Sequence, residues 1–518
     1  MEKPDVNYSL YLVTDSTPAI LGDRSLYHVV EEALKGGVTV VQLRDKTSDT
    51  GHLISTARRV HEITRRYNVP LLINDRVDVA LAVACEGVHV GQDDMELSTA
   101  RQLLGPNAII GVTVSTVDEA LRACEGGADY LGIGTVYATP TKTNTKEIIG
   151  TAGVRRILEA IAEAGYTTST VCIGGVNESN LQRILLQSGA AKKRLDGAAV
   201  VSAIMAAGDP EGAARKLLGL ANGRPAFQHT GPEALDPKTA LELVPRIIKQ
   251  IHDTTPLSHN MTNLVVQNFA ANVALAIGSS PIMANYGEEA PDLCKLGGAL
   301  VVNMGTVTPE GLANYVKALR AYNQAQRPVV LDPVGAGATS VRREAVKTIM
   351  ANGYLDVIKG NEGEIRTVFG DSGEQQRGVD SSSTLDASQK AKLVRELAAR
   401  EKNVIVMTGK TDFVSDGQQA FAIDNGHEYL GLVTGTGCTL GTAISAAIAS
   451  RPMDRLAAVI AAMLHFEIAA EMAAERAEVR GPGTFVPAFL DELYRIRQAT
   501  ANGELAWLQR ARIRRVDL

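Results

Sequence analysis

Short apolar runs alternate with longer segments of helical periodicity along about the first 220 residues. The runs are rich in β-branched residues and read as strands, and a segment with apolar positions at helical spacing follows each. The eight predicted strands span residues 9–15, 39–45, 70–75, 87–91, 108–114, 130–134, 170–176 and 197–204. The clearest helical segments are residues 49–67, 117–125, 151–164 and 210–220. This alternation predicts a (β/α)8 TIM barrel, with an open doubly wound α/β sheet as the alternative.

A stretch without apolar periodicity separates this region from the rest of the chain. Residues 223–238 contain three prolines and two glycines, which predicts a linker between a domain at 1–222 and a domain at 239–518. The second domain opens with predicted helices at about 239–252 and 263–276, the latter capped by Thr262 or Asn263. Strands are predicted in ALVVNMG, PVVLD, YLDVIKG and NVIVMTG, with a hairpin after the last. The pattern indicates a second α/β domain.

Polar side chains follow the ends of the predicted strands in the first domain, where a barrel builds its active site. Alternation along an extended segment places three of them on one side: Gln42, Arg44 and Lys46. Asn74 and Asp75 follow the third strand, and Asp94 follows the fourth. Two carboxylates that face one space repel unless a cation lies between them, and hard oxygen ligands suit Mg²⁺. The alternative is that Asp75 caps a helix and Asp94 lies in a solvated turn.

The remaining strand ends add groups suited to phosphate. Thr113 lies near the end of the fifth strand, and the seventh and eighth strands run into Gly174-Gly175 and Val201-Ser202. The sixth strand leads into TPTKT, which contributes Thr139, Pro140, Thr141 and Lys142. A glycine pair allows a ligand to approach the backbone, and the helix starts suit a phosphate. We interpret the rim as a site for two phosphate groups and Mg²⁺.

A glycine-rich loop that leads into an apolar helix is the most informative part of the second domain. Gly435, Gly437 and Gly441 surround a helix start with free backbone N–H groups, which suits an anion, although close helix packing is the alternative. Three polar residues could organise Mg²⁺ with a nucleotide, or serve as caps and turns: Asp332, Asn361 and Glu364. Met283 ends a short apolar run and fits either the core or a small apolar ligand pocket.

Composition narrows the class of protein. The net charge is -6, which gives no sign of a nucleic-acid or anionic-membrane partner. The five cysteines are scattered without a CxxC pair, so we expect neither a disulfide framework nor a zinc site. No uninterrupted run of 18 apolar residues and no signal-peptide core are present, so we predict no membrane span and a cytoplasmic location.

Six motifs in the first domain occur in the order and spacing of thiamine-phosphate synthase: QLRDK, IND, VGQDD, TPTKT, IGGV and VVSAI. That family joins a pyrimidine methyl diphosphate to a thiazole phosphate. The resemblance implies that Gln42, Arg44, Lys46, Asn74, Thr113 and Lys142 bind the pyrimidine diphosphate. It implies that Asp75 and Asp94 bind Mg²⁺, and that the thiazole phosphate contacts Thr139, Pro140, Thr141, Gly175, Val201 and Ser202. Thr113 stands where the family more usually has serine.

The second domain resembles hydroxyethylthiazole kinase, a family with a ribokinase-like α/β fold that uses ATP. The matching segments are MTNLVVQNFAAN, GSSPIM, DPVGAGATSVR, NEGE, MTG and TGTGCTLG. The resemblance implies that Met283 and Gly435 contact the thiazole. It places Arg342, Thr408, Asn361 and Glu364 at ATP and Cys438 at the catalytic position. Relatives usually have an aspartate base there, and a cysteine at a helix start could be partly thiolate or could have only a positioning role.

The order of the two domains is similar to that of fungal bifunctional thiamine biosynthetic enzymes. The resemblance implies small-molecule substrates and a homo-oligomer built on trimers, with a hexamer as one arrangement. Two alternatives remain: a catalytically dead sensor of thiamine precursors, and a barrel–kinase fusion that acts on another vitamin or sugar.

Overall fold

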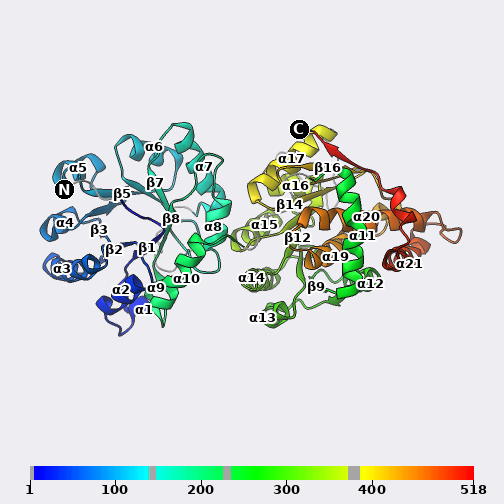
Figure 1. Ribbon diagram of the computed structural model, residues 1–518, viewed down its shortest axis with the longest axis horizontal. Helices are drawn as coiled ribbons and strands as arrows, with labels where there is room; N and C mark the ends of the chain where they lie inside the picture. The colour runs from blue at the N-terminus through cyan, green and yellow to red at the C-terminus, as the bar shows by residue number, and fades with distance from the viewer. Residues whose placement is uncertain (1–4, 138, 140–147, 226–234, 371–384, 518) are drawn as a thin grey trace. The chain divides into compact units, whose positions relative to one another are not determined.

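The chain folds into two units, Met1–Pro225 and Ala226–Leu518, which we call the barrel unit and the sheet unit (Figure 1). The computed structural model describes residues 5–137, 139, 148–225, 235–370 and 385–517. The boundary between the units falls inside the stretch at 223–238 that composition identified as a linker.

In the described part of the barrel unit, eight parallel strands form a closed barrel, so the open-sheet alternative is wrong. Each strand pairs with the next, and β8 pairs with β1. The strands are β1 (Leu10–Val13), β2 (Val40–Leu43), β3 (Leu71–Asn74), β4 (Gly87–Val90), β5 (Ile109–Val114), β6 (Tyr130–Ile133), β7 (Ser169–Cys172) and β8 (Gly197–Val200). Closure brings the C-terminal ends of all these strands to one rim.

Helices surround this barrel (Figure 1), and side chains cap the starts of some of them. They are α1 (Pro18–Leu21), α2 (Leu26–Lys35), α3 (Thr50–Arg66), α4 (Val77–Val83), α5 (Leu97–Leu104), α6 (Val117–Glu125), α7 (Gly150–Glu163), α8 (Leu181–Gln187), α9 (Ser202–Met205) and α10 (Pro210–Asn222). The Asp49 side chain accepts from the backbone N–H of His52 at the start of α3, and Thr116 with Glu119 forms a capping box on α6.

The seventh and eighth strands end earlier than the sequence predicts. β7 stops at Cys172, because Gly174 and Gly175 turn the chain with φ angles of 102° and 67°. β8 stops at Val200, because α9 begins at Ser202. The segments predicted as strand ends are therefore a glycine turn after β7 and the first residues of α9 after β8.

In the described residues of the sheet unit, nine strands form one sheet in the order β10-β9-β11-β12-β13-β14-β15-β16-β17. Strands β9 to β14 are parallel, and β15, β16 and β17 extend the sheet in antiparallel fashion. Their bounds are β9 (Leu257–Met261), β10 (Ser280–Ile282), β11 (Ala299–Asn303), β12 (Val329–Asp332), β13 (Val357–Asn361), β14 (Val404–Thr408), β15 (Asp412–Ser415), β16 (Ala420–Ile423) and β17 (Ile513–Val516). The predicted hairpin is β15–β16, whereas the pairing of the C-terminal strand β17 was not predicted.

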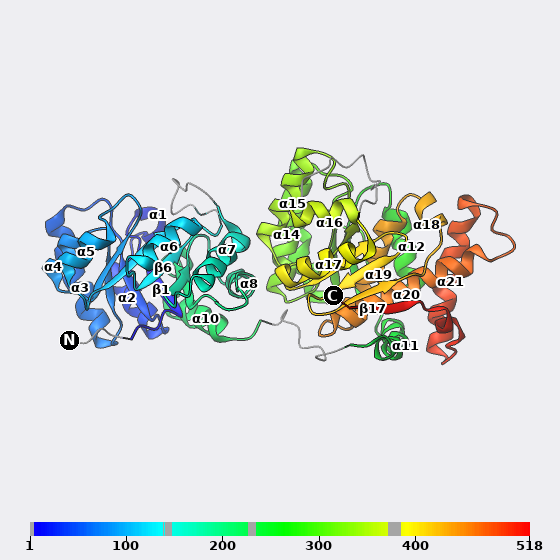
Figure 2. The same ribbon diagram turned by 90° about the horizontal axis from the view of Figure 1, so that it is seen from above.

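Helices cover both faces of this sheet (Figure 2). Val301 and Val330 point to one face and Leu300 and Leu331 to the other, as strand alternation requires. The first face packs against α11 (Pro237–Thr254), α12 (Gln267–Ile277), α19 (Thr436–Ser450), α20 (Arg455–Ala474) and α21 (Pro482–Ala501). The second packs against α14 (Pro309–Gln324), α15 (Ser340–Asn352), α16 (Glu362–Phe369) and α17 (Ala387–Glu401). Shorter helices are α13 (Ala290–Leu293), α18 (Tyr429–Leu432), η1 (Gly287–Glu289), η2 (Cys294–Leu296) and η3 (Ala506–Arg510).

Helix α20 is long and apolar enough to cross a membrane by length and composition, and it is the one such helix among the described residues. It is mostly buried inside the sheet unit and packs against α11, α19 and α21. A helix that is apolar on all sides because neighbours surround it is typical of a protein core. Its burial therefore explains its composition.

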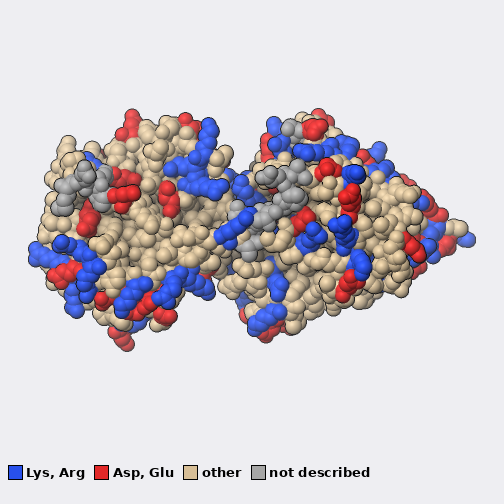
Figure 3. Space-filling model, in the orientation of Figure 1, with Lys and Arg blue, Asp and Glu red and all other residues tan. Residues whose placement is uncertain are grey.

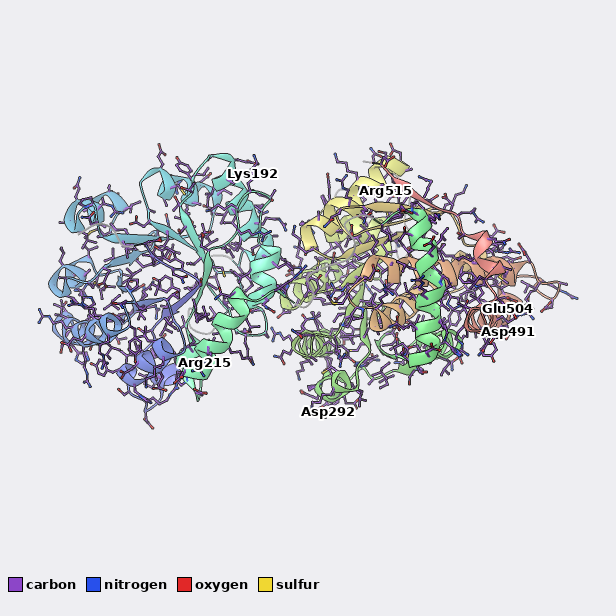
Figure 4. The ribbon with its side chains drawn as sticks, viewed as in Figure 1. Lys192, Arg215, Asp292, Asp491, Glu504 and Arg515 are labelled. Atoms are coloured by element: carbon purple, nitrogen blue, oxygen red, sulfur yellow. The ribbon has the colours of Figure 1, made fainter. Side chains whose placement is uncertain are left out.

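Charges of both signs are scattered over the visible face of each unit (Figure 3). Labelled side chains such as Lys192 and Arg215 on the barrel unit, and Asp292 and Asp491 on the sheet unit, point outward (Figure 4). All five cysteines are free thiols in this structure.

Candidate active sites

A cavity of about 370 Å³ lies at the C-terminal rim of the barrel. It brings together residues from widely separated positions that the sequence placed at one site. The predicted residues that line it are Gln42, Arg44, Lys46, Asn74, Asp75, Asp94, Thr113, Thr139, Gly175, Val201 and Ser202. Pro140, Thr141 and Lys142 lie outside the described residues.

The two predicted metal ligands come together at one side of this cavity. Asp75 follows β3 with a φ of 63°, and its Oδ2 lies 3.1 Å from Nζ of Lys46. Oδ2 of Asp94 accepts a hydrogen bond of 2.7 Å from the Gly91 backbone N–H. Burial, followed by contact with Asp75, raises the pKa of Asp94. The cap at the start of α4 is Arg76, so the alternative reading of Asp75 as a helix cap is wrong.

This pair fits Mg²⁺ that arrives with a phosphorylated substrate. Mg²⁺ typically uses one or two carboxylates and completes its octahedron with water and substrate phosphates. Two aspartates supply that number of protein ligands. Among the described residues no group of three or more His, Cys, Asp or Glu side chains could enclose a metal ion, so a cage made only of protein ligands does not fit here.

Arg44 is held at the rim by a residue that the sequence reading missed. Its Nη1 donates to Oδ2 of Asp15 at 3.3 Å, and its backbone N–H donates to the hydroxyl of Thr14 at 3.0 Å. Asp15 is 3% exposed and also accepts from the backbone and hydroxyl of Thr17. Asp15 could have been found from the sequence, because it is a carboxylate at the end of the first predicted strand. Carboxylates at the ends of the third and fourth strands had already been assigned to the site.

Side chains inside the barrel form a continuous hydrogen-bonded chain beneath the cavity. Nε2 of Gln42 donates to the hydroxyl of Tyr11, which lies 2.7 Å from the hydroxyl of Tyr130. That hydroxyl lies 2.7 Å from Nδ1 of His89, and Nε2 of His89 lies 2.7 Å from Oγ1 of Thr113. Tyr11, His89 and Tyr130 were missed as cavity residues. Their signal is a polar atom at an inward position of an otherwise apolar strand.

The two predicted phosphate loops border the same cavity. A Cβ on Gly174 would lie 2.4 Å from Cγ2 of Thr135, so the close packing leaves no space for a side chain at this position. Its φ of 102° also favours glycine. The carbonyl of Gly175 accepts hydrogen bonds from the side-chain amides of Asn177 and Asn180, which fixes the loop. Gly175 and the Val201-Ser202 turn therefore present backbone to the cavity from adjacent strand ends.

A second polar cluster lies at the C-terminal strand ends of the sheet unit. Nζ of Lys359 lies 3.2 Å from Oδ1 of Asp332 and donates to the Gly437 carbonyl at 2.8 Å. Asn303 donates to Asp332 at 2.8 Å. Lys359 and Asp332 are both buried, so the ion pair ties β12 and β13 to the start of α19. Lys359 was missed, although a lysine inside the apolar run VIKGN is an unusual strand residue.

Cys438 lies in the first turn of α19, above this ion pair. Gly435 precedes the helix with a φ of 95°. Burial, followed by the charge of Asp332, raises the pKa of Cys438 to about 11. The thiol is therefore neutral near neutral pH, which favours the positioning role over the partly thiolate alternative.

Two of the residues assigned to ATP are engaged with the backbone. Asn361 and Glu364 form a capping box at the start of α16, and Glu364 also accepts from the Gly335 N–H at 2.8 Å. Burial, followed by the charge of Asp332, raises the pKa of Glu364 to about 7. The cap reading that the sequence left open therefore describes both residues in this structure.

The other predicted kinase residues lie on loops around the same strand ends. Arg342 donates to the carbonyls of Met304, Gly305 and Val334, and so ties two loops together. Thr408 ends β14 beside Asn361. Met283 follows directly after β10 and is half-buried.

The predicted cap of α12 is wrong. The helix begins at Gln267 with Val266 as its cap, four residues beyond Asn263. Asn263 instead contacts Asn303, with Nδ2 to Oδ1 at 3.1 Å, and its own Oδ1 accepts from the Val265 N–H. A residue expected to start a helix is thus part of the polar cluster at the sheet.

Comparison with known proteins agrees with both halves of the chain. The thiamine monophosphate synthase model matches residues 10–204, and the hydroxyethylthiazole kinase family model matches residues 248–499. The probable thiamine biosynthetic bifunctional enzyme of Schizosaccharomyces pombe is 41% identical, over 99% of this chain and 100% of that protein.

Of two further relatives, one matches nearly the whole chain and the other matches the synthase half alone. The thiamine biosynthetic bifunctional enzyme of Saccharomyces cerevisiae is 37% identical over 95% of this chain and 96% of that protein. The thiamine-phosphate synthase of Clostridium novyi is 46% identical over 41% of this chain and 98% of its own length. The chain belongs to the family of bifunctional thiamine biosynthetic enzymes, with a thiamine-phosphate synthase half and a hydroxyethylthiazole kinase half.

Proposed function

We propose that the barrel cavity joins 4-amino-2-methyl-5-(diphosphooxymethyl)pyrimidine to a thiazole phosphate, giving thiamine phosphate and pyrophosphate. Residues of the second, third, fifth and sixth strand ends bind the pyrimidine diphosphate: Gln42, Arg44, Lys46, Asn74, Thr113 and Lys142. The thiazole phosphate is bound by residues that follow the sixth, seventh and eighth strands in the sequence: Thr139, Pro140, Thr141, Gly175, Val201 and Ser202. The meeting of Arg44, Lys46 and the Asp75–Asp94 pair in one cavity supports a diphosphate ligand.

The site contributes charge and position rather than a nucleophile. An electron-rich aminopyrimidine can lose pyrophosphate to leave a stabilised cation, which the thiazole nitrogen captures. Arg44 and Lys46 compensate the charge that develops on the departing pyrophosphate, and Gln42 and Asn74 orient the ring. Mg²⁺ held by Asp75 and Asp94 would neutralise the same diphosphate. A cavity lined on several sides holds the two substrates together and keeps water from the cation.

As a kinase, the sheet unit uses ATP as its co-substrate. We assign the hydroxyethylthiazole to Met283 and Gly435, and ATP to Arg342, Thr408, Asn361 and Glu364. Cys438 lies where the transferred phosphoryl group would meet the free N–H groups at the start of α19. Since its thiol is neutral, its contribution is to position the hydroxyl of the substrate. The thiazole phosphate made here is the substrate that the barrel consumes.

We also propose that the chain forms a homo-oligomer built on trimers of the sheet unit, including a hexamer as one arrangement. Leu264 and Val265 are 78% and 76% exposed beside the start of α12, close to Asn263 of the polar cluster. Exposed adjacent apolar side chains are typical of a protein interface. The expected location is the cytoplasm.

The observation that carries the proposal is that the described residues assigned to both substrates line one barrel cavity. The test supplies purified protein with hydroxyethylthiazole, ATP, Mg²⁺ and the pyrimidine diphosphate, and follows the products by phosphorus NMR. We expect thiamine phosphate, pyrophosphate and ADP. With pre-made thiazole phosphate, omission of ATP should leave the product unchanged. Formation of thiazole phosphate without thiamine phosphate would contradict the assignment of the barrel.

A further inference from the structure

The hydrogen bonds beneath the barrel cavity can run in one continuous direction from Gln42 to Thr113. With Nε2 of Gln42 as the donor, the oxygen of Tyr11 accepts, and the one hydrogen of that phenol is donated to Tyr130. The hydrogen of Tyr130 is then donated to Nδ1 of His89. His89 therefore carries its hydrogen on Nε2 and donates it to Oγ1 of Thr113.

Both phenols keep their hydrogens, which the directional argument requires. Burial raises the pKa of Tyr11 and of Tyr130 above the ordinary phenol value. Each ring also has a place made for it. A Cβ on Gly111 would lie 2.0 Å from Cζ of Tyr130, and a Cβ on Gly132 would lie 3.0 Å from Cε1 of His89. Glycine at these two strand positions leaves the space that the rings of Tyr130 and His89 occupy.

The two ends of the chain face the cavity with complementary hydrogen-bonding roles. Gln42 and Thr113 both line the cavity, on strands β2 and β5. When a hydrogen of Gln42 Nε2 is donated to Tyr11, the carbonyl oxygen of the same amide is the atom that can accept from a ligand. When Oγ1 of Thr113 accepts from His89, its hydrogen is left to donate. Rotation of the Gln42 amide would reverse every link, so that Gln42 would donate and Thr113 would accept.

We propose that Tyr11, Tyr130 and His89 are positioning residues that couple the Gln42 amide to the Thr113 hydroxyl across the barrel. The coupled pair offers one acceptor and one donor in fixed relation, which selects a heterocycle whose amino group donates beside an accepting ring nitrogen. A 4-oxo pyrimidine presents the reverse pattern, a carbonyl beside a ring N–H. To bind equally well, a 4-oxo pyrimidine would require every hydrogen bond between Gln42 and Thr113 to reverse its direction. This proposal rests on the proposed binding of an aminopyrimidine in the barrel cavity.

The test compares inhibition by the 4-amino and 4-oxo forms of 2-methyl-5-(hydroxymethyl)pyrimidine monophosphate. Neither carries the diphosphate leaving group, so the ratio of their inhibition constants reports recognition alone. Tyr130→Phe removes the central link of the chain. Tyr8→Phe is the matched control. Tyr8 is buried against the Tyr130 ring, with ring centroids 4.9 Å apart, but it is not one of the residues that link Gln42 to Thr113 by hydrogen bonds. Both variants are checked for folding by circular dichroism.

We expect wild type and Tyr8→Phe to prefer the 4-amino compound by the same ratio, and Tyr130→Phe to lower that ratio roughly tenfold. An equal loss of affinity for both compounds in Tyr130→Phe would mean that the hydroxyl is merely structural, and would overturn the proposal. An unchanged ratio would overturn it as well. If Tyr130→Phe does not fold, Tyr11→Phe breaks the chain one link earlier and the same ratio decides. Wild-type protein that forms no thiamine phosphate would instead refute the proposed function.

Discussion

Replacing Asp94 by asparagine should have opposite effects on stability and on synthase activity. The side chains of Asp75 and Asp94 are in contact, and after burial this contact is the next cause of the raised pKa of Asp94. Asp94→Asn keeps the oxygen that accepts from the Gly91 N–H and removes one of the two charges. The metal-free protein should become more stable, and the Mg²⁺-dependent reaction should become slower.

The size of the stability gain follows from the distance and the exposure. Two charges about 4 Å apart repel by about 1 kcal/mol in a water-like dielectric, which is the appropriate limit for this exposed carboxylate. For a unit of about 225 residues this corresponds to a rise in melting temperature of about 2–4 °C. Because the folded-state pKa of Asp94 is raised, the wild type loses this stability as pH rises through that pKa. The gain of the variant should therefore vanish in acid.

The rate effect is larger and has the opposite sign. Loss of one charged ligand should cost about 3 kcal/mol in the transition state, or about a hundredfold in the rate of thiamine phosphate formation. The assay measures the initial rate at limiting Mg²⁺ with pre-made thiazole phosphate, and calorimetry in EDTA measures the melting temperature. Asp23→Asn, in an exposed turn of the same unit, is the control for loss of a carboxylate. A near-normal rate together with a lowered melting temperature would refute the metal assignment.

Three further predictions concern the kinase half. Cys438→Ala should lower kinase turnover by less than the ~10²-fold expected for loss of a general base. Cys438→Asp should turn over faster than the alanine variant. An aspartate variant slower than the alanine variant would exclude a general base at this position. Lys359→Met leaves the Asp332 charge buried and should lower the free energy of unfolding by about 3–5 kcal/mol in urea titrations, and a loss below about 1 kcal/mol would contradict the ion pair. Glu364, with its pKa raised to about 7, holds a proton in the folded state that the unfolded chain releases, so stability should fall from pH 5 to pH 7. Glu364→Gln should flatten that slope in urea titrations at several pH values, and an unchanged slope would assign the effect elsewhere.

The barrel was predictable because its signals are local. Each strand is a short apolar run, and closure brings the strand ends to one rim, so Arg44, Asp75 and Thr113 could be assigned to one cavity before any coordinates. The chain from Tyr11 to His89 was not predictable in this way. Its members look like ordinary core residues in the sequence, and only the barrel closure brings β1, β4 and β6 together across the interior.

The contacts of the polar cluster in the sheet unit were harder to predict, because they depend on packing between segments far apart in the sequence. The ion pair of Lys359 joins two strands to a helix start about 80 residues further along the chain, and no local pattern specifies that contact. Asn263 was read as a helix cap because cap residues are recognised from their neighbours in sequence. The same locality left two alternatives open for the Cys438 thiol, since the helix start is visible in the sequence whereas burial beside Asp332 is not.

The most direct test of two self-contained catalytic units is the activity of residues 1–225 expressed alone. The fragment ends at the boundary between the units and contains every described residue that lines the barrel cavity. Given pre-made thiazole phosphate, the pyrimidine diphosphate and Mg²⁺, it should form thiamine phosphate at a rate within a few fold of the full chain. A fragment that is folded by circular dichroism but forms no thiamine phosphate would contradict the account, because the sheet unit would then be needed to complete the synthase site.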